Sequence, residues 1–350
     1  MANWVQITPN FPPVVCGVGD YSAGLAAALG NLGTGVTTLV ANENPISQPG
    51  RSLHGARSSR ALCDALRDTG ARVAIVHFSG YGYAPRGLCH WLVEGLRGWK
   101  ATQTDARIIT IFHEVYATGP IWRTSFWTSH PQRRIARALC EITDRGFVSS
   151  GVGSDQLRRI GASLSCDVLA VFSNVGEPAE VTPLSRRSAR AVVFGGRGQR
   201  AEVYHAIARN PQKTAQLLSN LQIDRLLDIG PRMPLPERIG ECPVDALGTL
   251  PAEEVSRILV DCRLGLLHYP MDRMTKSGIA AAYFSHGLLT ANTGTAGGAA
   301  SNLKEGVQYS SLDRLVAHCP DLQSVADAGH AWYQQHGVAA AAEIIRNSIA

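Results

Sequence analysis

The sequence predicts an α/β protein built from two Rossmann-like domains, each with a doubly wound parallel sheet. Short apolar runs alternate with helical patterns through nearly all of the 350 residues, which is typical of parallel strands joined by helical crossovers. The runs are almost entirely apolar, as expected where helices cover both faces of a sheet. The chain is too long for one ordinary core, so we expect two domains that face each other across a cleft.

The N-terminal domain is expected to span residues 1–180. Its candidate strands are short apolar runs, namely Trp4–Thr8, Val36–Ala41, Val73–Phe78, Ile108–His113, Arg145–Ser149 and Val168–Phe172. Helical patterns separate these runs, at about residues 21–32, 57–69, 85–98, 131–142 and 154–160. Ligands of such sheets bind at the carboxyl ends of the strands, so we expect the site residues to follow the strands directly.

The C-terminal domain is expected to span residues 181–323. A stretch at 176–190, "GEPAEVTPLSRRSAR", precedes its strands and lacks an apolar period, which predicts a linker. The candidate strands of this domain are Ala191–Gly195, Leu226–Ile229, Leu264–His268 and Leu288–Ala291. Residues 324–350 carry two helical patterns broken at Gly337.

The composition limits the classes of function. The net charge is +5, with arginine far ahead of lysine, which suits phosphate-bearing ligands or an anionic membrane surface. No basic stretch carries interleaved aromatic residues, so nucleic acid is not an expected partner. The eight cysteines form no C-x-x-C pair, which argues against zinc and for a reducing compartment. We see neither a signal peptide nor an apolar run of about 20 residues, so a cytoplasmic protein is expected.

A glycine-rich stretch, "VVCGVGDYSAGLAAALGNLG", follows the first candidate strand. A dinucleotide fingerprint requires the strand to run straight into G-x-G-x-x-G, but here the loop after Thr8 is too long and the sixth position is Ser22. Gly17 and Gly19 are expected to allow positive φ and a close backbone approach, and Asp20 to cap the following helix. A loop and cap without any ligand is the alternative interpretation.

The extended stretch "PPVVCGVGDYSAGLAAALGNLG" resembles the N-terminal loop of GT-B nucleotide-sugar glycosyltransferases of the bacterial group 1, or family 4-like, type. In that family a proline pair, a glycine loop and an amphipathic helix follow the first strand. The resemblance implies that Gly17, Gly19 and Asp20 contact the acceptor. It also implies that residues 324–350 cross back to the N-terminal domain.

The strand in "ARIITIFHEVY" ends at His113-Glu114. A zinc-protease motif would need a second histidine four residues on, and that position is Ala117. In the family, a histidine at the end of a central N-domain strand contacts the transferred sugar, and His113 matches this placement; a histidine of the core or surface is the alternative. His77 and Tyr81, in "VAIVHFSGYGY", are candidate acceptor contacts.

The segment "AVVFGGRGQR" places an arginine just after a strand, beside open glycine backbone. Arginine can bind a diphosphate through two parallel hydrogen bonds. The family has a Gly-Arg pair here and commonly a lysine a few residues later, both of which grip the diphosphate. Gly196 and Arg197 match the pair, and Arg200 would have to replace the lysine. A solvated surface arginine is the alternative interpretation of Arg197.

Two later segments complete the expected donor site. In "VDALGTLPAEEVSRILVDCRLGLLHYP", the order of strand, glycine, helix and strand resembles the donor-binding domain of the family, which implies that Gly248 and Leu250 lie near the nucleotide base. Thr293, after a later strand, would close the pocket floor. All of these positions follow candidate strands.

In "MDRMTKSGIAAAYFSHGLLTANTG", the family's best-known branch has two glutamates, whose positions here are Met274 and Ala282. Lys276, Ser277 and Gly278 remain at the start of a helix. Free N–H groups, the positive helix end and one lysine make an anion site. This pattern resembles a bacterial variant of the fold.

The resemblance implies transfer of a sugar from a nucleotide-sugar to a glycan, lipid-linked or small-molecule acceptor. It implies retention of the anomeric configuration, with no cofactor and no essential metal, and His113, Arg197 and Lys276 as the catalytic set. A nucleotide-sugar epimerase, less so a dehydrogenase, and a degenerate nucleotide-sugar-binding protein are the alternatives. The Arg-rich helix "PQRRIARAL" could touch the inner face of a membrane, or form an ordinary solvated helix face.

Overall fold

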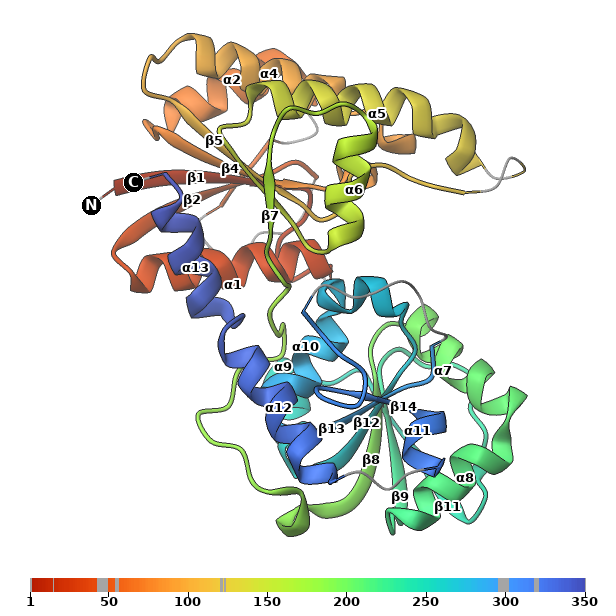
Figure 1. Ribbon diagram of the computed structural model, residues 1–350. Coiled ribbons are helices and arrows are strands. Elements are labelled where there is room, and N and C mark those ends of the chain that lie inside the picture. Colours follow the sequence, from red (N-terminus) through yellow and green to blue (C-terminus); the bar gives the residue numbers. More distant parts are fainter. Residues whose placement is uncertain are drawn as a thin grey trace. The chain divides into compact units, whose positions relative to one another are not determined.

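The computed structural model describes residues 2–14, 16–42, 50–53, 57–119, 122, 124–294, 302–317 and 321–349. The chain divides into two compact units. Unit 1 comprises Met1–Ala170 and Val338–Ala350, and unit 2 comprises Val171–Gly337 (Figure 1). The boundary expected from the sequence, at residues 180/181, falls inside unit 2.

Unit 1 contains a seven-stranded parallel sheet with the order β3-β2-β1-β4-β5-β6-β7. Its strands are β1 (Ala2–Thr8), β2 (Thr34–Val40), β3 (Gly50–Ser52), β4 (Val73–Phe78), β5 (Arg107–Phe112), β6 (Arg145–Val148) and β7 (Cys166–Val168). Its helices are α1 (Gly17–Asn31), α2 (Ser59–Asp68), α3 (Gly80–Tyr83), the 3₁₀ turn η1 (Pro85–Gly87), α4 (His90–Ala101), α5 (Thr124–Ile142), α6 (Gly151–Arg159) and the C-terminal α13 (Val338–Asn347).

Helices α2, α4 and α5 cover one face of this sheet, and α1 and α13 cover the other (Figure 1). Because side chains alternate along a strand, Val5 and Ile7 of β1 pack into the core under α2 and α4. Gln6, between them, points to the face beneath α1, where its amide donates to the Ser22 carbonyl. This second face of the sheet therefore buries polar groups, and Gln6 is one of them.

Unit 2 contains a seven-stranded sheet with the order β10-β11-β9-β8-β12-β13-β14, parallel except for the antiparallel pair of β10 and β11. The strands are β8 (Ser188–Phe194), β9 (Arg225–Ile229), β10 (Arg238–Ile239), β11 (Cys242–Gly248), β12 (Cys262–Leu267), β13 (Leu289–Asn292) and β14 (Ser310–Ser311). The helices are η2 (Leu184–Arg186), α7 (Arg197–Arg209), α8 (Pro211–Asn220), α9 (Ala252–Asp261), η3 (Met271–Lys276), α10 (Gly278–Ser285), α11 (Leu312–Ala317) and α12 (Leu322–Gln334).

Both sheets reverse their strand order at their first strand. In unit 1 the reversal lies between β1 and β4, and in unit 2 it lies between β8 and β12. Ligands of open α/β sheets bind outside the carboxyl ends of the strands at such a switch point. We therefore expect ligand-binding residues in the loops after β4, β5, β8 and β12.

Most of the expected elements are present, including the helix break at Gly337, which separates α12 from α13. The expected strand at Val168–Phe172 is wrong, because β7 ends at Val168. The Leu169 N–H still donates to Val148 of β6, whereas the Val171 N–H donates to Thr275 in unit 2. Phe172 is buried there, so this apolar run is the buried passage between the two units.

Candidate active site

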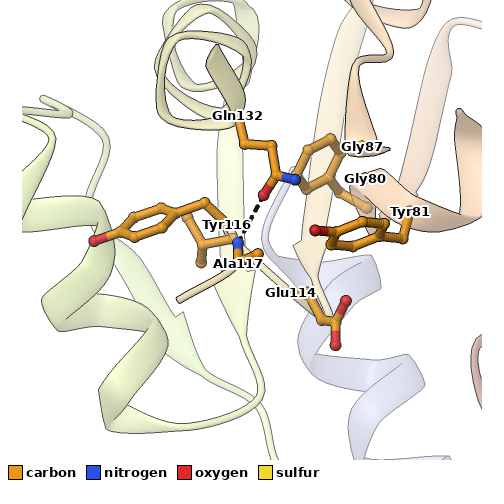
Figure 2. Close-up of a pocket in the computed structure, with 9 residues that line it drawn as sticks. Gly80, Tyr81, Gly87, Glu114, Tyr116, Ala117 and Gln132 are labelled. Carbon is orange, nitrogen blue, oxygen red and sulfur yellow. Dashed lines mark hydrogen bonds between the residues drawn. The ribbon is translucent and has the colours of Figure 1, made fainter. Parts of the chain in front are cut away.

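A small pocket of about 10 Å³ opens at the carboxyl ends of β4 and β5 in unit 1 (Figure 2). The Tyr81 ring and the Glu114 carboxylate lie at its rim, and the Tyr116 ring points away from it. The Tyr81 side chain is 47% exposed, so it is open to a ligand. Glu114 is also exposed, and its carboxylate accepts a hydrogen bond of 3.1 Å from the Ser79 hydroxyl.

One amide from α5 holds both loops of this pocket. Gln132 accepts from the Ala117 N–H at 2.7 Å (Figure 2). It also donates to the Arg86 carbonyl at 2.7 Å. Gly87 has φ +72°, and a Cβ there would lie 2.8 Å from the Gln132 amide nitrogen, so glycine is required. The loops that carry Tyr81 and Glu114 are thereby fixed to each other.

Beneath this pocket, a buried chain of polar side chains runs from Gln6 to His113. The Gln6 amide nitrogen donates to the Thr38 hydroxyl at 2.8 Å and to the Ser22 carbonyl at 3.2 Å, so its oxygen must face His77. That oxygen lies 3.0 Å from His77 Nε2, and His77 Nδ1 lies 3.2 Å from His113 Nε2. The two imidazole rings are stacked, with centroids 5.5 Å apart.

The direction of donation along this chain follows from chemistry. Burial, with a further effect from His113, lowers the pKa of His77 well below its ordinary value of 6.5, so His77 is neutral near pH 7. Since Gln6 offers an oxygen, His77 carries its proton on Nε2 and accepts on Nδ1. His113 must then donate from Nε2, which fixes its ring orientation and, when the ring is neutral, its tautomer.

His77 is therefore not an acceptor contact as expected from the sequence. Its side chain is fully buried and both ring nitrogens are used, so its role is to orient His113. His113 itself is 8% exposed at the end of β5. Gln6 was missed in the sequence, although a glutamine inside an apolar strand is a signal for a buried polar partner.

Replacing Gln6 with Leu tests this chain of hydrogen bonds. The His77 Nε2–H would lose its acceptor, which is expected to cost about 1–3 kcal/mol of stability. The fixed tautomer of His113 should be lost at the same time, read from the imidazole ¹⁵N chemical shifts. Gln6→Glu, which keeps an acceptor oxygen, should retain the Nε2–H of His77. Unchanged His113 shifts in Gln6→Leu would refute the assignment.

The two glycines of the segment after β1 differ: Gly19 is buried and packed, whereas Gly17 is exposed, with open space where a Cβ would lie. Gly17 and Gly19 lie in the first turn of α1 and neither has positive φ, contrary to expectation. A Cβ on Gly19 would lie 2.9 Å from the Asn10 carbonyl oxygen, which confirms the close backbone approach but explains it by packing. Cys16 is the N-cap, so Asp20 does not cap the helix; it lies in the first turn, where its charge favours the positive helix end.

In unit 2, two helix N-termini meet at the switch point of the sheet. Gly196 is the N-cap of α7 and Arg197 is its first residue, with an exposed side chain whose guanidinium donates to the Arg232 carbonyl. Gly195 has φ +133°, and a Cβ there would lie 2.6 Å from Ile279 Cδ1. The first turn of α10, which contains Ile279, therefore packs directly against the turn that begins α7.

Arg200 does not contact the donor site as expected. Its side chain is 1% exposed, and its guanidinium donates to Asp228, to the Pro231 carbonyl and, at 3.0 Å, to the Gly195 carbonyl. The Tyr204 hydroxyl donates to the other carboxylate oxygen of Asp228 at 3.0 Å. Arg200 thus ties the end of β8 to the end of β9 from inside the core.

A glycine is needed at position 230 for the ends of β8 and β9 to come this close. Gly230 has φ +150°, and a Cβ there would collide with the Gly195 carbonyl and the Arg200 guanidinium. Its N–H donates to the Gly248 carbonyl at 2.9 Å, which joins β9 to the end of β11. Gly248, at φ +75°, and the half-buried Leu250 follow β11 at this same edge. The sequence signal for this arrangement is the aspartate in the apolar strand "LLDIG".

The start of α10 differs from expectation in one respect. Ser277 is buried and is the N-cap: its hydroxyl accepts from the Ala280 N–H at 3.2 Å, while its own N–H donates to the Met274 carbonyl at 3.0 Å. Ser277 therefore has no N–H to offer a ligand. Gly278 is open, with nothing near the position of a Cβ, and half-buried Lys276 precedes the cap.

The two positions where the family's best-known branch has glutamates are filled by core residues. The Met274 side chain is 1% exposed, and Ala282 is fully buried. Thr293 is half-buried after β13; its N–H donates to the Leu267 carbonyl at 2.7 Å and its hydroxyl lies 3.0 Å from His268 Nδ1. Thr293 also lines a pocket of about 410 Å³.

A buried histidine at the end of α10 makes the stability of unit 2 depend on pH. His286 donates from Nδ1 to the Ala282 carbonyl at 2.7 Å, and its Nε2 lies 2.7 Å from the Ser256 hydroxyl. Burial lowers the pKa of His286 from 6.5 to about 4.

Between these values the unfolded chain binds a proton that the folded chain does not, so stability falls as the pH drops below 6.5. The expected loss at pH 5 is about 1–2 kcal/mol from this group, measured by urea unfolding at pH 7 and pH 5. His286→Gln should flatten the pH dependence. An equal slope in this variant would show that His286 does not cause it.

No protein-family model matches the sequence, and no curated protein matches it. Solved structures do match in fold. A glycosyltransferase from Rickettsia africae has 11% identity and a TM-score of 0.62, with 99% of this chain and 97% of that chain covered. An alpha-glucosyltransferase in complex with UDP and DNA has 9% identity and a TM-score of 0.61, covering 99% and 98%.

A protein named as a UDP-N-acetylglucosamine 2-epimerase, from Listeria monocytogenes, also matches, with 11% identity, a TM-score of 0.59 and coverage of 99% and 95%. Among the described residues, no helix is both long and apolar enough to cross a bilayer, and no cluster of three metal-ligating side chains occurs. The matches span whole chains, and both units have the Rossmann-like strand order. The chain has the GT-B fold.

Proposed function

We propose that this protein is a glycosyltransferase that moves a sugar from a nucleotide-sugar to an acceptor hydroxyl. The observation that carries the proposal is the convergence of the α7 and α10 N-termini at the switch point of unit 2, documented by the packing of Ile279 against Gly195. Arg197 and Lys276 flank these helix starts. Two positive helix ends and two cations suit a diphosphate.

In the proposed reaction, the bond between the anomeric carbon and the diphosphate oxygen breaks, a bond to the acceptor oxygen forms, and the proton of the acceptor hydroxyl passes to the leaving diphosphate. Negative charge develops on the leaving nucleoside diphosphate, which Arg197, Lys276 and the Gly278 N–H stabilise. Gly196 contributes backbone beside Arg197, Gly248 and Leu250 lie near the base, and Thr293 bounds the pocket. These basic groups serve in place of a divalent cation, and no cofactor is invoked.

Unit 1 supplies the sugar and acceptor contacts in this proposal. His113, held as the Nε2–H tautomer, orients the transferred sugar. Tyr81 offers an exposed ring for acceptor stacking, and Glu114 can accept a hydrogen bond from the acceptor hydroxyl. The acceptor is a glycan, a lipid-linked sugar or a small molecule. Comparing the anomeric signals of donor and product by NMR tests the retention that we infer.

A melting-temperature screen against UDP-, GDP-, ADP- and dTDP-sugars tests donor binding, because a ligand that binds only the native state raises its stability. The donor that raises the melting temperature is then incubated with candidate acceptors, and release of nucleoside diphosphate is measured. No shift with any sugar nucleotide would contradict the proposal. Binding without turnover, with any acceptor, would support a degenerate nucleotide-sugar-binding protein, the alternative suggested by Met274 and Ala282.

An epimerase is the second candidate, supported by the whole-chain similarity to the protein from Listeria monocytogenes. The two candidates differ in a reaction without acceptor. An epimerase would convert the nucleotide-sugar to its epimer, seen by NMR, whereas a transferase would leave it unchanged or hydrolyse it slowly. Formation of the epimer would replace the transferase proposal.

A further inference from the structure

Three large aromatic side chains are exposed at the start of α5 in unit 1. Trp122 is 81% exposed, Trp127 is 71% exposed and Phe126 is 42% exposed. Grouped exposure of this kind marks an interaction site, whereas single exposed apolar residues are common. The other large exposed apolar residues of the described chain are scattered along it, at Tyr81, Leu88, Val168, Leu247, Val307 and Ile344.

The same side of α5 carries the positive charge. Arg133, Arg134 and Arg137 are exposed and lie at helical spacing from Phe126, Trp127 and His130, whereas Ile135, Ala136, Leu139 and Cys140 are buried in the core of unit 1. Glu141, the only acid in the sequence of α5, is paired with Arg137 at 3.6 Å. We call Phe126, Trp127, His130, Arg133, Arg134 and Arg137 the aromatic–arginine face; Trp122 comes just before α5 in the sequence.

A pocket of about 330 Å³ lies within this face. Phe126 and Trp127 form part of its wall, with His130 and Arg133. Ser129 is 6% exposed and also lines the pocket, and its hydroxyl has no hydrogen-bond partner among the described residues. Arg133 is held over the Tyr116 ring, 4.8 Å from its centroid.

We propose that the aromatic–arginine face docks on an anionic phospholipid bilayer. Tryptophan prefers the membrane–water interface, and arginines beside it are attracted to anionic headgroups. The pocket would receive one headgroup phosphate, with Arg133 as the cation. A phosphate group suits this combination better than a neutral sugar does, because the face has three arginines and the acid of α5, Glu141, is paired with one of them, Arg137. The proposal does not depend on glycosyl transfer.

Vesicle sedimentation of the full chain tests this proposal. We expect binding to phosphatidylcholine vesicles that contain phosphatidylglycerol, at least tenfold above pure phosphatidylcholine, and weaker binding as salt rises. Arg134→Glu/Arg137→Glu and, separately, Trp122→Ser/Trp127→Ser should each lower the affinity more than tenfold.

Matched controls change other exposed residues of unit 1. Arg60 and Arg72, with side chains 93% and 74% exposed on the same unit, provide the charge control Arg60→Glu/Arg72→Glu, which should bind as the unchanged protein does. Melting temperatures of all variants should agree. Equal binding to both kinds of vesicle, or an equal loss in the charge control, would overturn the proposal. So would tighter binding of a single-stranded oligonucleotide or of a soluble phosphate ester to the same face.

Discussion

Replacing Lys276 with Ala is expected to lower turnover by an order of magnitude or more. Lys276 ends η3 immediately before the N-cap of α10, and Ile279 in the first turn of α10 packs against Gly195 at the turn that starts α7. One preorganised charge contact to a leaving group is worth roughly 2–4 kcal/mol in the transition state. The loss should appear in kcat, measured by nucleoside diphosphate release, because the charge develops as the bond breaks.

Two further variants show whether the position matters. Lys276→Arg keeps the charge and should recover part of the lost turnover. Lys304→Ala removes a different lysine of unit 2, one that is exposed, and should leave turnover unchanged. Unchanged turnover in Lys276→Ala would remove Lys276 from the mechanism, while leaving open the donor binding measured by melting temperature. An equal loss in Lys304→Ala would indicate a general effect of charge.

Replacing Arg200 with Leu is expected to destabilise unit 2 by about 3–5 kcal/mol, because the buried carboxylate of Asp228 would lose its partner. Two carbonyl groups, of Gly195 and Pro231, would also lose a donor. A loss of this size corresponds to a fall of roughly 10 °C in the melting temperature of a unit of this length. Differential scanning calorimetry measures it.

The matched control lies three residues earlier in the same helix. Arg197→Leu changes an exposed side chain and should leave the melting temperature nearly unchanged, while it weakens binding of the donor. The double variant Arg200→Leu/Asp228→Leu should regain part of the stability lost in Arg200→Leu, since no charge then stays buried alone. If the melting temperature of Arg200→Leu equals that of the unchanged protein, the ion pair between Arg200 and Asp228 does not stabilise unit 2.

The order of strands and helices could largely be predicted from local sequence patterns. Apolar runs bounded by helical periods predicted most strands of both sheets, including β4 at its observed bounds, Val73–Phe78. The short strands β3, β10 and β14 were not predicted. The pattern failed at Val168–Phe172, because a short apolar run is equally compatible with a strand and with a buried connection. It also placed the start of the helix at 131–142 at Pro131, whereas α5 begins at Thr124 and includes that proline.

The candidate site could be predicted only in part, because the direction of a side chain depends on partners that are distant in the sequence. Arg197 and Arg200 are close in sequence and both were expected at the donor, yet one is exposed and the other is buried against Asp228. His77 and His113 both end strands, and the parallel pairing of β4 and β5 brings them together.

The sequence by itself determined the fold class, because this depends on periodicity. It also determined which loops follow the carboxyl ends of the strands and which types of residue they carry. Only the tertiary structure decided which groups reach a ligand and which close the core. Gln6 sets the tautomer of His113 through His77, and the Gly195–Ile279 contact joins two helix starts. Such pairs are far apart in the chain, so no local pattern encodes them, and packing alone selects the burial of each side chain.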